Sequence, residues 1–156
     1  MIKLVRIDHR LLHGQVVFSW CKQLNIERII VVDDTTAGDE FQKVSLNLSK
    51  PTGTQLNIFS VKETLEKMPK IEQLPENIMM IFGNTSSVLS FCQQYSAISE
   101  INYGVITKKE GSKQYSQAIY LNNQELEDSI KLKNMGIELF MQQVPASKKE
   151  VLNDRI

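Results

Sequence analysis

The stretch RIDHRLLHGQV, at residues 6–16, gathers the groups that phosphoryl chemistry needs. It contains both histidines of the protein, His9 and His13, with two arginines and one carboxylate. A neutral imidazole is a good nucleophile at neutral pH. Guanidinium groups and the free backbone N–H groups at a helix start suit a dianionic phosphoryl group. The stretch therefore predicts a histidine that carries phosphate.

His13 is the expected nucleophile, because it directly precedes Gly14, Gln15 and Val16, where a helix pattern begins. Its ring can lie near unpaired N–H groups at the positive helix end. Gly14 lets the backbone come close to a bound oxyanion. A purely structural role in capping the helix is the alternative for His13. His9 is a weaker candidate, and we interpret it as an exposed loop or partner-contact residue.

The other polar residues of the stretch have separable roles. Arg10 is the expected phosphate clamp, because a guanidinium stays protonated and binds two phosphoryl oxygens at once; a surface salt bridge with Asp8 is the alternative. We interpret Asp8 as orienting Arg10 or the imidazole N–H, and not as a base. For Arg6, inside a strand pattern, a structural ion pair and a catalytic role are equally well supported. Gln15 can donate to phosphate or partner, although solvation on the helix surface explains it nearly as well.

The elements that must position this stretch follow from the hydrophobic pattern. Strands are expected at residues 2–8, 28–33, 56–61, 78–82, 100–106, 116–121 and 137–144. Helices are expected after His13, over 39–49 with Phe41, Val44 and Leu48 on one face, and around Leu65 and Met68 up to Pro69. A further helix is expected after Thr85 or Ser86 as its cap. Another is expected to begin at Asn122 or Asn123 as its cap and to end at Gly136 in the αL conformation, and a last one is expected after Ser147. The alternation predicts an α/β domain with a three-layer open sheet, mostly parallel, with helices on both faces.

Polar groups follow three of these strands, and ligands of open parallel sheets bind beyond the carboxyl ends of the strands. The groups are Asp8 to His13, Asp33 to Thr36, and Asn84 with Thr85 and Ser86. Right-handed crossovers would bring them to one edge. Asn84, Thr85 and Ser86 are thus candidates for a second anion-contacting rim, although capping the next helix explains them equally well. Asp33 and Asp34 can hold Mg²⁺, but capping and loop solvation explain this pair better.

Composition bounds the remaining possibilities. The 156 residues suit one domain over 1–156. The 18 acidic and 18 basic residues balance, so no global field attracts nucleic acid. Cys21 and Cys92 lie in no metal or redox spacing and are expected as small apolar filler. No phosphate loop, zinc set or serine elbow occurs. Without a signal peptide or a membrane-spanning run, the protein is expected in the cytoplasm.

The stretch at 6–16, the following helix with Trp20, and the strand RIIVVDD closely resemble the IIB component of the mannose–fructose–sorbose family of the phosphoenolpyruvate-dependent sugar phosphotransferase system. The family pattern is Arg, Ile or Val, Asp, a variable residue, then Arg-Leu-Ile-His-Gly-Gln-Val. Here Leu12 takes the isoleucine place and His9 the variable one. The segment NMGIEL is similar too. One departure is Asn102-Tyr103-Gly104-Val105, where the family usually has a small glycine-rich turn; it bears on the rim of the site and not on His13.

The resemblance implies that His13 is phosphorylated on Nδ1, with Arg10 beside it as the stabilising cation. It implies a relay in which a phosphohistidine IIA protein or domain donates to His13, and His13 donates to a sugar bound by the membrane components IIC and IID. It implies peripheral association with that membrane complex and no cofactor or metal. A homodimer is compatible with the sequence.

Two other function classes stay open. A receiver-like regulatory domain would be phosphorylated on aspartate with Mg²⁺ held by Asp33 and Asp34. Against it, this acidic pair follows the second strand, and no aspartate ends the third. The other class is a non-catalytic binding module of the transport complex, in which His13 is structural.

Overall fold

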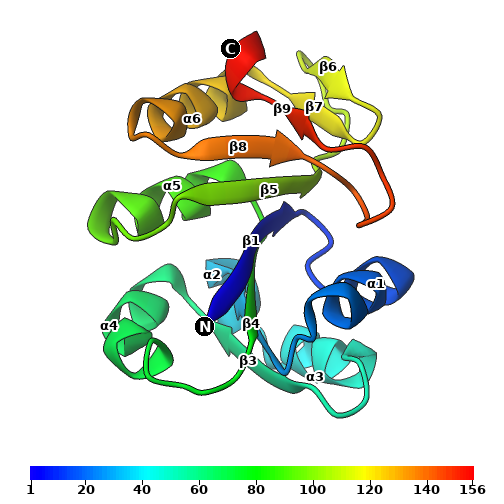
Figure 1. The fold of residues 1–156 in the computed structure, drawn as a ribbon, viewed down its shortest axis with the longest axis vertical. Helices are drawn as coiled ribbons and strands as arrows, with labels where there is room; N and C mark the ends of the chain where they lie inside the picture. Colours follow the sequence, from blue (N-terminus) through cyan, green and yellow to red (C-terminus); the bar gives the residue numbers. More distant parts are fainter.

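The computed structural model describes all 156 residues, and its centre is a seven-stranded sheet (Figure 1). The strands are β1 (Ile2–Asp8), β2 (Arg28–Val32), β3 (Gln55–Phe59), β4 (Ile78–Phe82), β5 (Glu100–Val105), β8 (Glu138–Met141) and β9 (Glu150–Val151). Their order is β3-β2-β4-β1-β5-β8-β9, and every neighbouring pair is parallel except β8 with β9. The predicted open, mostly parallel sheet is confirmed.

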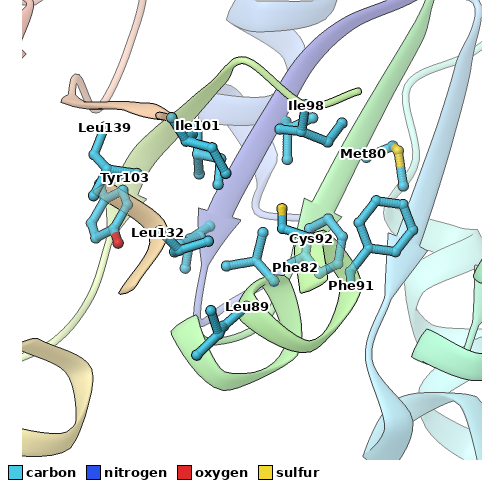
Figure 2. Close-up of a cluster of buried hydrophobic side chains, with 14 of the residues drawn as sticks. Met80, Phe82, Leu89, Phe91, Cys92, Ile98, Ile101, Tyr103, Leu132 and Leu139 are labelled. Carbon is cyan, nitrogen blue, oxygen red and sulfur yellow. The ribbon is translucent and has the colours of Figure 1, made fainter. Parts of the chain in front are cut away.

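Helices cover both faces of the sheet (Figure 1). On one face lie α1 (Gly14–Leu24) and α3 (Glu40–Ser49), and on the other lie α4 (Val61–Ile71), α5 (Thr85–Gln94) and α6 (Asn123–Asn134). The short α2 (Asp34–Ala37) follows β2, and a 3-10 turn (Asn153–Arg155) ends the chain. Each face has its own apolar cluster. The larger one packs Phe82, Phe91 and Leu132 beneath α5 and α6 (Figure 2). This packing explains why β2 and β4 are continuous apolar runs.

Side-chain caps begin most of the helices. Ser60 and Asn122 each form a reciprocal capping box with the glutamate three residues later. Asn122 is thus the cap of α6, and Gly136 takes the expected left-handed conformation behind it, with φ 85°. The cap of α5 is Asn84 and not Thr85 or Ser86 as expected, because the Asn84 Oδ1 accepts a hydrogen bond from the Ser87 N–H.

Three expected elements differ in the structure. The strand expected at 116–121 is confirmed only for β7 (Ile119–Leu121), because the chain turns at residues 117–118. There β7 forms an antiparallel hairpin with β6 (Lys113–Ser116), outside the main sheet. Pro69 does not end its helix, since Met68 and Ile71 are both buried in the core and hold α4 together past the proline. The tail from Ser147 adds the edge strand β9 before its 3-10 turn.

Other features of the packing bear on the sequence predictions. Cys21 and Cys92 are buried as expected, and burial raises the pKa of these thiols to about 11 and about 12. In contrast, the apolar stripe of α3 faces solvent: Phe41, Val44 and Leu48 are 83%, 59% and 84% exposed. No helix has both the length and the apolar character that crossing a membrane requires.

Tyr103, the residue of the family departure, lies inside the larger apolar cluster and not on the rim of the site (Figure 2). Its hydroxyl lies 2.7 Å from the Ser129 Oγ, which itself donates to the Glu125 carbonyl. Burial raises the pKa of the phenol. We expect Tyr103→Phe to lower the free energy of unfolding by about 0.5–1.5 kcal/mol, because one buried hydrogen bond is lost. Urea unfolding measures this loss; an unchanged stability would contradict the assigned bond.

Candidate functional site

The histidine-rich stretch forms the loop between β1 and α1, at the carboxyl end of the sheet. His13 is the N-cap residue of α1, with extended backbone (φ −131°, ψ 97°). Its side chain is exposed and makes no capping hydrogen bond. The capping alternative for His13 therefore loses its support, and the ring is free for other chemistry.

Two leucines anchor this loop to the protein. Leu11 and Leu12 are buried in the apolar cluster under α1 and α3. Leu11 has a left-handed backbone (φ 61°), and its N–H donates to the Asp8 carbonyl at 2.9 Å. A left-handed leucine is strained, so its burial must hold this turn in place. The anchored turn leaves His9 and His13 exposed and Arg10 half-buried.

Asp8 is the hub of the charged groups and is fully buried. Its Oδ2 accepts from the Arg6 Nη2 at 3.0 Å. Its Oδ1 accepts from the Arg10 backbone N–H at 2.9 Å and from the Arg10 Nε at 3.4 Å. Asp8 therefore orients Arg10, one of its two expected roles. The Arg10 Nη2 is buried without a partner in the chain, which leaves a donor of the guanidinium free.

Arg6 is a buried structural cation, the first of the two roles considered for it. Its Nη1 donates to the Asn102 Oδ1 at 2.7 Å and to the Gln142 carbonyl at 3.3 Å. The Arg6 guanidinium also lies 5.9 Å from the centre of the Trp20 ring. Burial lowers the pKa of Arg6, while the negative charge of Asp8 acts in the opposite direction. With every contact inside the protein, Arg6 does not present itself to a phosphoryl group.

The start of α1 offers a run of free backbone donors. The N–H groups of residues 12–15 donate to no acceptor in the chain, and the first bonded ones are those of Val16 and Val17, to the His13 carbonyl. Gly14 has φ 37° and open space where a side chain would stand. Successive free N–H groups near a left-handed residue favour an oxyanion. Gln15 is exposed on the first turn of the helix.

The candidate second rim is only partly assembled. Asn84 lines a polar cavity of about 420 Å³ together with Arg10, Asp33 and Gly83, so the carboxyl ends of β1, β2 and β4 do meet. Thr85 is buried and donates to the Asp128 Oδ2 at 2.8 Å, away from the loop. Ser86 lines a different hollow, between α4 and α5. Of the three residues, only Asn84 shares a cavity with Arg10.

The carboxylates of Asp33 and Asp34 bind the starts of two helices. The Asp33 Oδ2 accepts from the Thr36 N–H at 3.0 Å and from its hydroxyl at 2.7 Å, which starts α2. The Asp34 Oδ1 accepts from the Val61 N–H at 2.8 Å, at the start of α4. The capping interpretation is thus confirmed for Asp33. Both carboxylates already bind groups of the chain, so the receiver-like alternative loses its support.

Three residues around Arg6 were not predicted as part of the site: Asn102 and Gln142, which bond it, and Gly104, which leaves space for it. The Asn102 side chain closes a triangle with Arg6 by donating to the Gln142 carbonyl at 3.0 Å. One signal could have found Asn102. It is an amide between Ile101 and Tyr103 in a fully buried strand, and buried polar groups need partners.

The fold and the loop together define an open α/β domain that presents two exposed histidines, His9 and His13, at the carboxyl end of its parallel sheet. The family model described as "PTS system sorbose subfamily IIB component" matches residues 2–156, and the chain belongs to this family of sugar phosphotransferase components. The resemblance seen in the sequence is confirmed.

Similar proteins agree with this family. The "N-acetylgalactosamine-specific phosphotransferase enzyme IIB component 1" of Escherichia coli (strain K12) is 30% identical over 154 residues, which cover 98% of this chain and 97% of that protein. The "PTS system mannose-specific EIIAB component" of the same strain is 31% identical over 100% of this chain but only 48% of its own length. The crystal structure of the IIBSor domain of the sorbose permease from Klebsiella pneumoniae superposes with a TM-score of 0.90 at 29% identity, covering 99% of this chain and 95% of that one.

Proposed function

We propose that the chain is a phosphocarrier that accepts a phosphoryl group on His13 from a phosphohistidine IIA protein and passes it to a sugar bound by the membrane components IIC and IID. This proposal rests mainly on one observation. The His13 side chain is exposed and makes no hydrogen bond, and the backbone N–H groups of residues 12–15 have no acceptor in the chain. The mannose-specific relative, whose name joins IIA and IIB in one chain, supports IIA as the donor.

In the donor step, the Nδ1 lone pair of neutral His13 forms a bond to phosphorus while the P–N bond of the donor phosphohistidine breaks. The transferring group is metaphosphate-like, so catalysis consists mainly of alignment and of positive groups around its oxygens. Arg10 supplies the fixed charge, with the N–H groups of Gly14 and Gln15 as further donors. Neither a metal nor a nucleotide takes part in this step.

In the acceptor step, a sugar hydroxyl displaces the imidazole. The P–N bond breaks, a P–O bond forms, and the hydroxyl proton goes to the freed Nδ1 of the ring, which then releases one proton to solvent. His13 then returns to its neutral form. Two partners must reach the same ring in turn, which the exposed loop permits. This relay places the protein at the cytoplasmic side of a membrane complex.

The test is phosphorylation by IIA protein charged from phosphoenolpyruvate through the general carrier proteins. We expect the protein to take up acid-labile, base-stable phosphate, as a phosphohistidine requires. A hydroxylamine-sensitive phosphate that depends on Mg²⁺ would instead indicate an aspartyl phosphate. No uptake from a competent donor would indicate the non-catalytic binding module.

Arg10→Lys tests the clamp. We expect the transfer rate to fall about 10- to 100-fold, because a point charge replaces a guanidinium that Asp8 aligns through its Nε and that can bind two oxygens. Rapid-quench kinetics with phosphorylated IIA measures the rate. Arg28→Lys is the matched control, because Arg28 pairs with Glu76 near the opposite end of the sheet. Equal rates for Arg10→Lys and the parent would contradict the clamp.

A further inference from the structure

The sheet consists of two halves, β3-β2-β4-β1 and β5-β8-β9, which are joined only where β1 pairs with β5, beneath the loop between β1 and α1. β1 pairs with β4 from Ile2 onward, but its pairing with β5 begins at Arg6 with Asn102 and ends at Asp8. Below this point β1 and β5 diverge (Figure 1), and a cavity of about 300 Å³ opens between residues 1–5 and 97–100. The seam between the halves is therefore a short segment, and it coincides with the charged residues of the loop.

Arg6 occupies this seam and links three strands. It is the largest fully buried side chain of the protein. It bonds Asp8 on its own strand, Asn102 on β5 and the Gln142 carbonyl just after β8. Gly104 makes room for it, because a Cβ at this position would overlap the Arg6 guanidinium. Gly104 has no positive φ, so space and not backbone conformation accounts for the glycine.

We infer that Asn102 and Gly104 are positioning residues for phosphoryl transfer, which reach the reaction through Arg6, Asp8 and Arg10. The connection is continuous. The Asn102 Oδ1 holds the Arg6 Nη1, the Arg6 Nη2 holds the Asp8 Oδ2, and the Asp8 Oδ1 holds the backbone N–H and Nε of Arg10. If Asn102 or Gly104 changes, Arg6 can rotate, and the carboxylate that aligns Arg10 is released. This inference rests on the proposed function.

Asn102→Ala is the principal test, with His13 phosphorylation by phosphorylated IIA as the reaction. The rate constant at saturating donor is expected to fall about 10- to 100-fold, since small misplacements of a clamp have effects of this size. The KM for the donor is expected to change little, because Asn102 is buried and takes no part in docking. Rates are taken per folded molecule, so that a loss of stability alone does not appear as a slower reaction.

Asn57→Ala is the matched control. The Asn57 Oδ1 accepts from the Arg28 Nη1 at 2.6 Å, across the neighbouring strands β3 and β2. The variant loses the same kind of bond between an amide and an arginine, far from the loop. Its rate constant is expected to equal that of the parent.

Two further variants separate positioning from a merely structural role. Gly104→Ala should slow the reaction like Asn102→Ala, by pushing Arg6 instead of releasing it. Asn102→Asp keeps an oxygen acceptor for Arg6 and should recover part of the rate. In Asn102→Ala and in Gly104→Ala the NMR resonance of the Arg10 Nε–H should move, because the Asp8 carboxylate that it binds has shifted.

The outcomes distinguish this inference from the proposed function. If the parent is labelled on His13 and both Asn102→Ala and Gly104→Ala react at the parent rate, the inference is overturned while the proposed function stands. If the parent takes no phosphoryl group on His13, the proposed function fails first. Slow transfer with unchanged KM in both variants, and a normal rate in Asn57→Ala, supports the inference.

Discussion

His13→Ala will fold normally and take up no phosphoryl group from phosphorylated IIA. The His13 ring is exposed and makes no hydrogen bond, so its removal leaves no buried group without a partner. The expected change in unfolding free energy is within about 0.5 kcal/mol, as for other surface substitutions. The labelling is lost because His13 is the histidine that directly precedes α1 and its free backbone N–H groups.

His9→Ala is the control for this result. His9 is also exposed in the same loop, and its backbone N–H, which donates to the Val105 carbonyl at 3.2 Å, is retained in the variant. We expect His9→Ala to keep most of the labelling. If labelling disappears in His9→Ala and persists in His13→Ala, the phosphorylated residue is His9 and the assignment is wrong.

Asp8→Ala is expected to be among the most destabilising substitutions in the protein. Asp8 is fully buried and is the only carboxylate paired with Arg6. Its removal leaves the buried guanidinium without a counter-charge, which costs about 3–5 kcal/mol. Against a typical total stability of about 5–15 kcal/mol, this loss is large. Urea unfolding followed by circular dichroism measures it.

The double variant Arg6→Met with Asp8→Leu identifies the cause of that loss. If the unpaired charge is responsible, removing both charges should recover much of the stability lost in Asp8→Ala, because apolar residues of similar size tolerate burial well. A double variant no more stable than Asp8→Ala would show that the cause lies in packing or in the loop. In either case the double variant should transfer phosphate slowly, since Arg10 loses its partner.

Much of the fold could be predicted because it follows from local patterns. The buried runs at β2 and β4 and the helical spacing after His13 are visible within short windows. The hairpin of β6 and β7 was missed because β6 has a single apolar residue, Tyr115, whereas β7 (Ile119–Leu121) is apolar throughout. Pro69 misled the prediction because tertiary packing of its neighbours outweighs the local cost of the proline.

The candidate site divides in the same way. His13, Arg10 and Asp8 lie within six residues of one another, so one loop brings them together and the sequence alone could predict their association. Asn102 and Gln142 reach Arg6 only because β1 lies beside β5, and β5 beside β8. Strand order is a long-range property that the chain does not display locally. Thr85 likewise follows the right strand, but the packing of α5 on α6 directs its hydroxyl to Asp128.

The most direct measurement is tandem mass spectrometry of the protein after treatment with phosphorylated IIA, under alkaline conditions that preserve phosphohistidine. We predict that one phosphoryl group is added and that the fragment ions place it on His13. If the added mass lies on another side chain while the His13 ring is unmodified, the proposed function is contradicted.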